Sequence, residues 1–80
     1  MSTPKYIQLN ELQVNEKAIV HDMLDQNQRM EFMERGLLIG EELTMLRKST
    51  LGHMLALEVR GTVLAMRHCD ACLVIVLKNQ

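Results

Sequence analysis

Short runs of alternating or β-branched apolar residues, separated by polar turns, make up most of the chain. This pattern predicts five short β-strands, over residues 17–24, 42–47, 54–60, 63–67 and 72–78. Residues 28–35 differ, because apolar side chains recur there at helical spacing and run into a glycine. They predict one short helix after the first strand.

Glycines and one asparagine mark the turns between these elements. Gly36 stands where a helix commonly ends in a left-handed residue, and Gly40 can open the turn into the second strand. Gly61 lies in a tight reversal between two strands, and Asn15 tolerates the positive φ of a turn. Short strands joined in this way, without a βαβ rhythm, predict a small closed or half-closed β-barrel.

The length of 80 residues predicts a single domain over residues 1–80, with residues 1–5 as a frayed lead. A chain of this size buries only about 60–65% of its unfolded surface, which leaves little room for a deep substrate cleft. The sequence shows neither a signal-peptide pattern nor an apolar run approaching the ~20 residues of a membrane helix. We therefore expect a cytoplasmic protein with reduced cysteines and no direct membrane insertion.

The charge pattern argues against a nucleic-acid partner. The formal net charge is −1, and no run of basic residues exceeds two. Tyr6 and Phe32 are the only aromatic residues, so the chain lacks both a basic stripe and a set of stacking side chains. We expect it to bind no nucleic acid.

One corner of the sequence holds candidate metal ligands, namely His68, Cys69 and Cys72. Two thiolates at C-x-x-C spacing can chelate a soft metal, and the adjacent imidazole could add a nitrogen. A structural zinc site needs about four ligands, however, and a redox pair normally stands at a helix N-terminus, whereas this pair leads into a predicted strand. We expect incidental cysteines beside an inward-facing Ala71, with a weak Fe(II) or Zn(II) site or a redox pair as alternatives.

Other reactive residues have simpler interpretations. Asp22 and Asp25, next to His21, could approach a hard cation, but a solvated strand end and a helix cap are commoner roles. Four of the seven methionines stand at apolar periodic positions and are expected in the core: Met30, Met33, Met45 and Met66. The sequence contains no catalytic set and no phosphate-binding glycine loop, so we expect no enzyme activity.

The last strand has more apolar residues than a small barrel can bury on one face. If Val74 and Val76 point inward, the alternation turns Leu73, Ile75 and Leu77 outward. Two interpretations stay open. Either the N-terminal segment covers this face through Tyr6, Ile7 and Leu9, or the face is a surface for a partner or a homodimer.

An ordered set of residues spans positions 7–77. Leu9 and Leu12 precede the 18–20 strand; Arg29 and the apolar helix positions run into Gly36, Leu37 and Gly40; Gly52 precedes Leu55-x-Leu57-x-Val59-x-Gly61; residues 64–67 are followed, after three residues, by Ala71, Val74 and Val76. On these features the chain resembles the FeoA family of small ferrous-iron transport accessory proteins. Two positions depart from the usual pattern: Ile39 replaces a common proline, and Asn15 replaces a common glycine.

The resemblance implies a mainly β fold, specifically a small SH3-like β-barrel of about five strands with one short helix inserted after the first strand. It also implies a cytoplasmic, non-enzymatic accessory or regulatory protein that binds a membrane ferrous-iron transporter with its own GTPase domain, is recruited by it to the inner face of the membrane, and requires no cofactor. The expected contact residues are Leu37, Leu38, Ile39, Leu73, Ile75 and Leu77. The alternative function is a metal-responsive regulatory module that binds iron or zinc through His68, Cys69 and Cys72.

Overall fold

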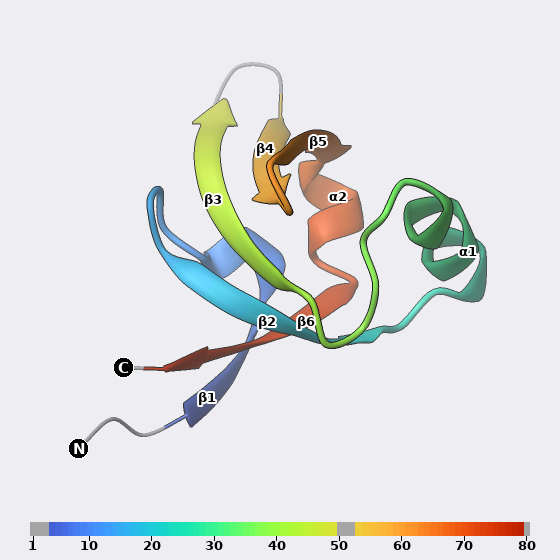
Figure 1. The fold of residues 1–80 in the computed structure, drawn as a ribbon, viewed down its shortest axis with the longest axis horizontal. Helices are drawn as coiled ribbons and strands as arrows, with labels where there is room; N and C mark the ends of the chain where they lie inside the picture. The colour runs from blue at the N-terminus through green and yellow to red at the C-terminus, as the bar shows by residue number, and fades with distance from the viewer. Residues whose placement is uncertain (1–3, 50–52, 80) are drawn as a thin grey trace.

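The computed structural model describes residues 4–49 and 53–79, which form one strongly curved antiparallel sheet with short helical segments (Figure 1). Its elements are β1 (Pro4–Gln8), the 3-10 helix η1 (Leu9–Glu11), β2 (Lys17–Met23), α1 (Gln26–Glu34), β3 (Glu42–Ser49), β4 (Met54–Val59), β5 (Thr62–Arg67), α2 (His68–Ala71) and β6 (Val74–Asn79). Within the described residues the sheet has six strands in the order β1-β6-β2-β3-β4-β5. β1 and β5 are therefore its two edges.

Two features of the predicted fold need correction. The five predicted strands and the helix are present, but β1 adds a sixth strand, so residues 4 and 5 are paired rather than frayed. Among the described residues β1 and β5 do not pair with each other, so the sheet is not closed into a barrel. The remainder of the predicted frayed lead, residues 1–3, and the Gly52 loop lie outside the described residues.

The sheet curves because two of its strands each carry an extra residue. In β2, His21 is an extra residue in the pairing with β6, and in β3, Leu46 is an extra residue in the pairing with β4. Such bulges bend a strand and increase its twist. They allow β2 and β3 to bend along their length, and Figure 1 shows β3 as a strongly curved strand.

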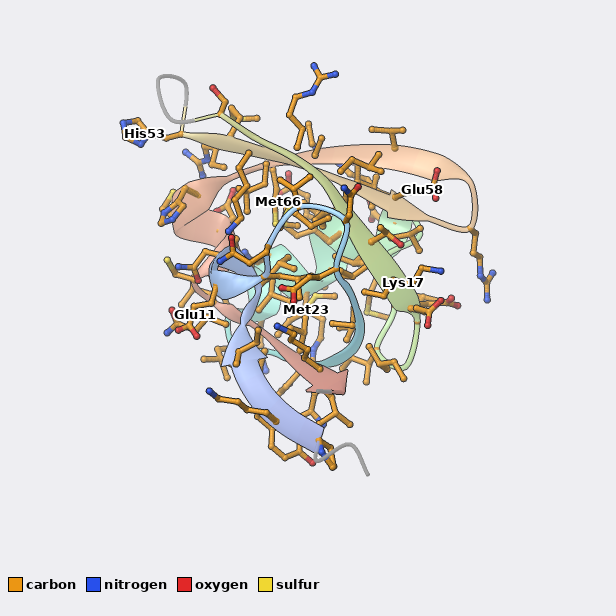
Figure 2. All side chains as sticks on the ribbon, turned by 90° about the vertical axis from the view of Figure 1, so that its left-hand side faces the viewer. Glu11, Lys17, Met23, His53, Glu58 and Met66 are labelled. Atoms are coloured by element: carbon orange, nitrogen blue, oxygen red, sulfur yellow. The ribbon has the colours of Figure 1, made fainter. Side chains whose placement is uncertain are left out.

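Buried side chains from the strands, the helices and the connecting segments meet in one core. Its fully buried large members are Leu9, Leu12, Val20, Leu37, Leu43, Met45, Leu57, Val74 and Val76. Met45 and Met66 are buried as predicted (Met66 is labelled in Figure 2). The prediction is wrong for Met30 and Met33, which are 66% and 44% exposed. α1 instead buries Gln28 and Phe32, so the helical phase turns both methionines away from the core.

Both ends of α1 are fixed by local hydrogen bonds. The Asp25 side chain accepts a hydrogen bond from the Asn27 N–H at 3.0 Å, which confirms the predicted cap. At the other end the Gly36 N–H donates to the Met33 carbonyl, and the Leu37 N–H donates to the Phe32 carbonyl. With Gly36 at φ +101°, these two bonds form a Schellman motif and turn Leu37 into the core.

The reversal between β4 and β5 depends on Gly61. Arg60 and Gly61 have φ of +53° and +78°, as in the type I′ turn that matches strand twist. We expect Gly61→Val to lower the free energy of unfolding by about 1–3 kcal/mol, because a β-branched residue is strained at positive φ. Urea unfolding measures the loss.

Gly61→Asn is the matched control, since asparagine tolerates positive φ. A Cβ at position 61 meets no atom within 4 Å, so backbone conformation rather than a clash separates the two variants. Equal stabilities for the valine and asparagine variants would contradict this explanation.

Candidate functional site

Several exposed apolar residues lie on α1 or in segments joined to it, and α1 projects from one side of the sheet in Figure 1. We call them the α1 patch: Leu24, Met30, Met33, Ile39 and Leu73. Met30 and Met33 lie on the helix, while Leu24 precedes it and Ile39 follows it in the turn to β3. The Leu24 N–H donates to the Leu73 carbonyl at 2.8 Å. This bond joins the segment before α1 to the segment before β6.

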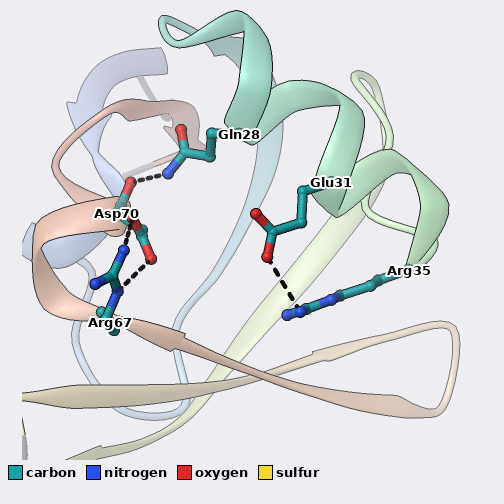
Figure 3. Close-up of polar contacts among 5 residues, drawn as sticks. All are labelled: Gln28, Glu31, Arg35, Arg67 and Asp70. Atoms are coloured by element: carbon teal, nitrogen blue, oxygen red, sulfur yellow. Dashed lines mark hydrogen bonds and ion pairs between the residues drawn. The ribbon is translucent and has the colours of Figure 1, made fainter.

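One side of α1 packs on the rest of the molecule through Phe32. Phe32 is buried, and the Arg35 guanidinium lies 5.5 Å from its ring centroid. Arg35 also pairs with Glu31 at 3.1 Å on the same helix (Figure 3). Phe32 and Gln28 are the buried residues of α1, whereas Met30 and Met33 are exposed to solvent.

The predicted contact residues separate into three groups. Leu37 is completely buried, which removes it from the predicted surface. Leu38 is half-buried, as are Ile75 and Leu77 of β6. Ile39 and Leu73 are exposed and belong to the α1 patch.

The N-terminal segment covers β6 along its edge. β1 pairs with β6 from Pro4 opposite Asn79 to Gln8 opposite Ile75, and Leu9 enters the core. Tyr6 stays largely exposed and contacts the His21 ring at a centroid distance of 4.6 Å. Partial cover by β1 therefore accounts for the half-burial of Ile75 and Leu77. That this face also forms a homodimer stays a prediction.

A polar junction links α1 to α2 (Figure 3). Gln28, only 6% exposed, donates from Nε2 to the Asp70 carbonyl at 2.6 Å. The Asp70 carboxylate accepts a hydrogen bond from Arg67 Nε at 3.1 Å. This bond and the negative charge of Asp70 raise the pKa of Arg67 above its ordinary value. Gln28 Oε1 is buried without a hydrogen-bond partner among the described residues.

The corner that holds the candidate metal ligands is a helical turn, so the predicted strand start is wrong. His68 and Cys69 lie in α2, Cys72 follows as its C-cap, and Ala71 is buried as predicted. His68 Nδ1 lies 4.0 Å from Cys72 Sγ. Among residues 4–49 and 53–79, no three His, Cys, Asp or Glu side chains are grouped so that they could hold a metal ion.

The same corner opens on a shallow surface pocket. Its lining includes His68 and Cys69 of α2, together with His53 at the start of the β4–β5 hairpin. The His68 N–H donates to the His53 carbonyl at 2.6 Å, which holds the two segments together. His53 itself projects away from the molecule (Figure 2).

The acidic residues near His21 have structural partners. Asp22 Oδ1 accepts hydrogen bonds from the Met23 N–H at 2.8 Å and from Arg29 Nη2 at 2.7 Å. Asp25 caps α1, as described above. These bonds give both carboxylates the strand-end and capping roles that the sequence favoured.

An ion pair joins the chain's last strand to the turn before β2. Lys78 Nζ lies 2.5 Å from Glu16 Oε2, and the Gln13 N–H donates to Glu16 Oε1 at 2.8 Å. The Lys78 hydrogen bond, followed by that from Gln13, lowers the pKa of Glu16 below its ordinary 4.5. A carboxylate whose pKa is lower in the folded state than in the unfolded state stabilises the fold when the pH is above the unfolded-state pKa. This stabilisation is lost as the pH falls through the folded-state pKa.

We therefore expect Glu16→Gln to lose less stability than the wild type on acidification below pH 4.5. Urea midpoints measured at neutral and acidic pH give the difference between the two proteins. Glu34→Gln, which changes an exposed carboxylate on α1, is the control and should keep the wild-type pH dependence. An unchanged acid dependence in Glu16→Gln would show that the pair contributes nothing measurable.

The described geometry defines a small, mainly β domain of the SH3-like class with an exposed apolar patch. The FeoA domain family model matches residues 7–78, and the chain belongs to this family. The family comprises small accessory domains associated with ferrous iron transport. Within the described residues, no helix has the length and apolar character needed to span a bilayer.

Solved structures agree with this assignment. The chain is 29% identical to the FeoA protein from Chlorobium tepidum, over 90% of this chain and 70% of that one, with a TM-score of 0.83. It is 25% identical to a protein described as iron uptake regulatory protein (FeoA), over 95% and 99% of the two chains, with a TM-score of 0.80.

The fold also occurs in a manganese-dependent transcriptional repressor in complex with manganese, at 18% identity. That match covers 95% of this chain and 38% of the repressor, with a TM-score of 0.85. At this identity the likeness shows the fold alone. None of the curated proteins matches the chain.

Proposed function

We propose that this chain is a non-enzymatic accessory protein of ferrous iron uptake that binds the cytoplasmic GTPase region of a membrane ferrous-iron transporter. Membership of the FeoA family supports the link to iron uptake. Docking on such a partner would bring the protein to the inner face of the membrane without any membrane-spanning segment of its own.

The α1 patch is the observation that carries this proposal. Met30 and Leu24 are 66% and 59% exposed, and the three further members of the patch, Met33, Ile39 and Leu73, are exposed as well. Grouped exposed apolar residues commonly mark protein-binding surfaces on small soluble domains. Methionine is well suited to this role because its flexible thioether adapts to an irregular partner surface.

The patch also differs from the surface predicted from the sequence. It retains Ile39 and Leu73, loses Leu37 to the core, and gains Leu24 and the two methionines of α1. Binding of the purified chain to the isolated GTPase region tests the proposal, and we expect saturable binding without added metal.

The metal-responsive alternative has weaker support. It requires His68, Cys69 and Cys72 to act together, whereas the 4.0 Å contact in this corner joins His68 to Cys72 and does not include Cys69. It stays a prediction, and Fe(II) or Zn(II) stoichiometry in the wild type and in a Cys69→Ser/Cys72→Ser variant tests it. Equal stoichiometry in both proteins would reject it.

A further inference from the structure

The two cysteines of the chain lie within one helical turn. The Cys72 N–H donates to the His68 carbonyl at 3.2 Å, and Cys72 has helical φ and ψ of −64° and −20°. Residues three apart in an α-helix have Cα atoms about 5 Å apart, as follows from the rise and radius of the helix. Disulfides span Cα separations of roughly 4.4–6.8 Å, so the Cα spacing of Cys69 and Cys72 suits a disulfide that forms with a small local adjustment of the turn.

The surroundings of the pair allow a reagent to reach it. Cys69 is exposed and lies on the rim of the surface pocket, while Cys72 is half-buried. His68 Nδ1 lies 4.0 Å from Cys72 Sγ, so an imidazole with this nitrogen unprotonated can accept the thiol proton. The sequence contains only these two cysteines, so no other thiol of the chain competes for either of them.

We propose that Cys69 and Cys72 form a reversible dithiol–disulfide pair that reacts with small-molecule disulfides. Cys72 loses its proton to His68 and attacks one sulfur of the small disulfide, which releases the other sulfur as a thiolate. Cys69 gives its proton to the released thiolate, attacks the Cys72 sulfur of the mixed disulfide, and releases the second small molecule as a thiolate that takes the proton held by His68. Two protein thiols are oxidised to one disulfide, and one small disulfide is reduced to two thiols.

Asp70 couples this reaction to the rest of the fold, because it stands between the two cysteines. Its carbonyl accepts the hydrogen bond from the buried Gln28 of α1, and its carboxylate pairs with Arg67. Helical Cβ atoms at this spacing are about 5–6 Å apart, whereas a disulfide brings them to roughly 3.5–4.5 Å. Bond formation therefore tightens α2 around Asp70 and alters the junction with α1.

The test is to incubate the purified, folded wild-type protein in glutathione buffers that range from fully reduced to fully oxidised. We expect a monomer that has lost two hydrogen atoms by mass, with both thiols disappearing in one transition and returning in excess reduced glutathione. The NMR signals of the Gln28 side-chain amide should shift in the same transition. Stable glutathione adducts, disulfide-linked dimers as the sole product, or two unmodified thiols would each overturn the proposal.

Variants test the assigned roles. Cys69→Ser should accumulate a glutathione adduct on Cys72, because the second attack is removed. His68→Gln should slow oxidation about tenfold, since the neighbouring proton acceptor is lost. His21→Gln changes an imidazole that lies on β2 against Tyr6, and it should react at the wild-type rate. Equal rates for the two histidine variants would remove His68 from the reaction.

Discussion

Replacing Leu37 by alanine is expected to lower the free energy of unfolding by about 2–5 kcal/mol. Leu37 has no exposed surface and follows directly after the glycine that ends α1. Its N–H closes the Schellman motif on the Phe32 carbonyl, and both side chains belong to the same core cluster. The truncation removes apolar contacts and leaves a cavity beneath the end of the helix.

This loss is large for a chain of this length. At about 0.05–0.15 kcal/mol per residue, an 80-residue domain has a total stability on the order of 4–12 kcal/mol. Urea unfolding followed by circular dichroism measures the change in the free energy of unfolding. At the upper end of the expected loss, Leu37→Ala is unfolded even without urea. Either result identifies Leu37 as a core residue.

Ile39→Ala is the matched control from the same turn. Ile39 is 47% exposed, so its truncation should change stability by less than about 0.5 kcal/mol. If Ile39→Ala cost as much as Leu37→Ala, or if Leu37→Ala were neutral, the described division of this turn into core and surface would be wrong.

Charged substitutions in the α1 patch are expected to weaken partner binding by more than about tenfold. Met30→Glu and Leu24→Glu each place a carboxylate at a position that is largely exposed in the free protein. Burying an unpaired charge against a partner costs free energy, and apolar contacts near the centre of an interface dominate its affinity. Because neither position is in the core, the urea midpoint should stay close to that of the wild type.

Val14→Glu is the control for this pair. Val14 is 45% exposed and belongs to the segment between η1 and β2. In Figure 1 this segment lies on the opposite side of the molecule from α1. Val14→Glu should bind the partner with wild-type affinity. Unchanged binding in both patch variants, or an equal loss in Val14→Glu, would show that the contact surface lies elsewhere.

The sequence predicted those elements whose alternation is strong. β4 reads as Leu55, Leu57 and Val59 facing inward, and the observed strand buries these three residues. β1 has no such pattern, since Ile7 is its one partly buried apolar residue and edge pairing with β6 holds the strand in place. Edge strands of this kind depend on their partner more than on their own sequence, so local periodicity could not reveal it.

The candidate site was harder to predict than the fold. Met30 and Met33 have helical spacing, but the phase of α1 is set by Phe32 and by the buried amide of Gln28, a polar residue that hydropathy assigns to the surface. The α2 turn is a single turn held by its tertiary contacts, including the Gln28 bond to Asp70. A tertiary hydrogen bond between residues 42 positions apart leaves no local signal in the sequence.

The most direct test of the proposed function is anaerobic titration calorimetry of the purified chain with the isolated cytoplasmic GTPase region of its cognate ferrous-iron transporter. Titrations with and without nucleotide, and with and without Fe(II), separate protein docking from metal-dependent binding. We predict saturable binding in the absence of metal that Met30→Glu weakens and Val14→Glu does not. Binding that requires Fe(II), or no binding in any condition, would contradict the proposed function.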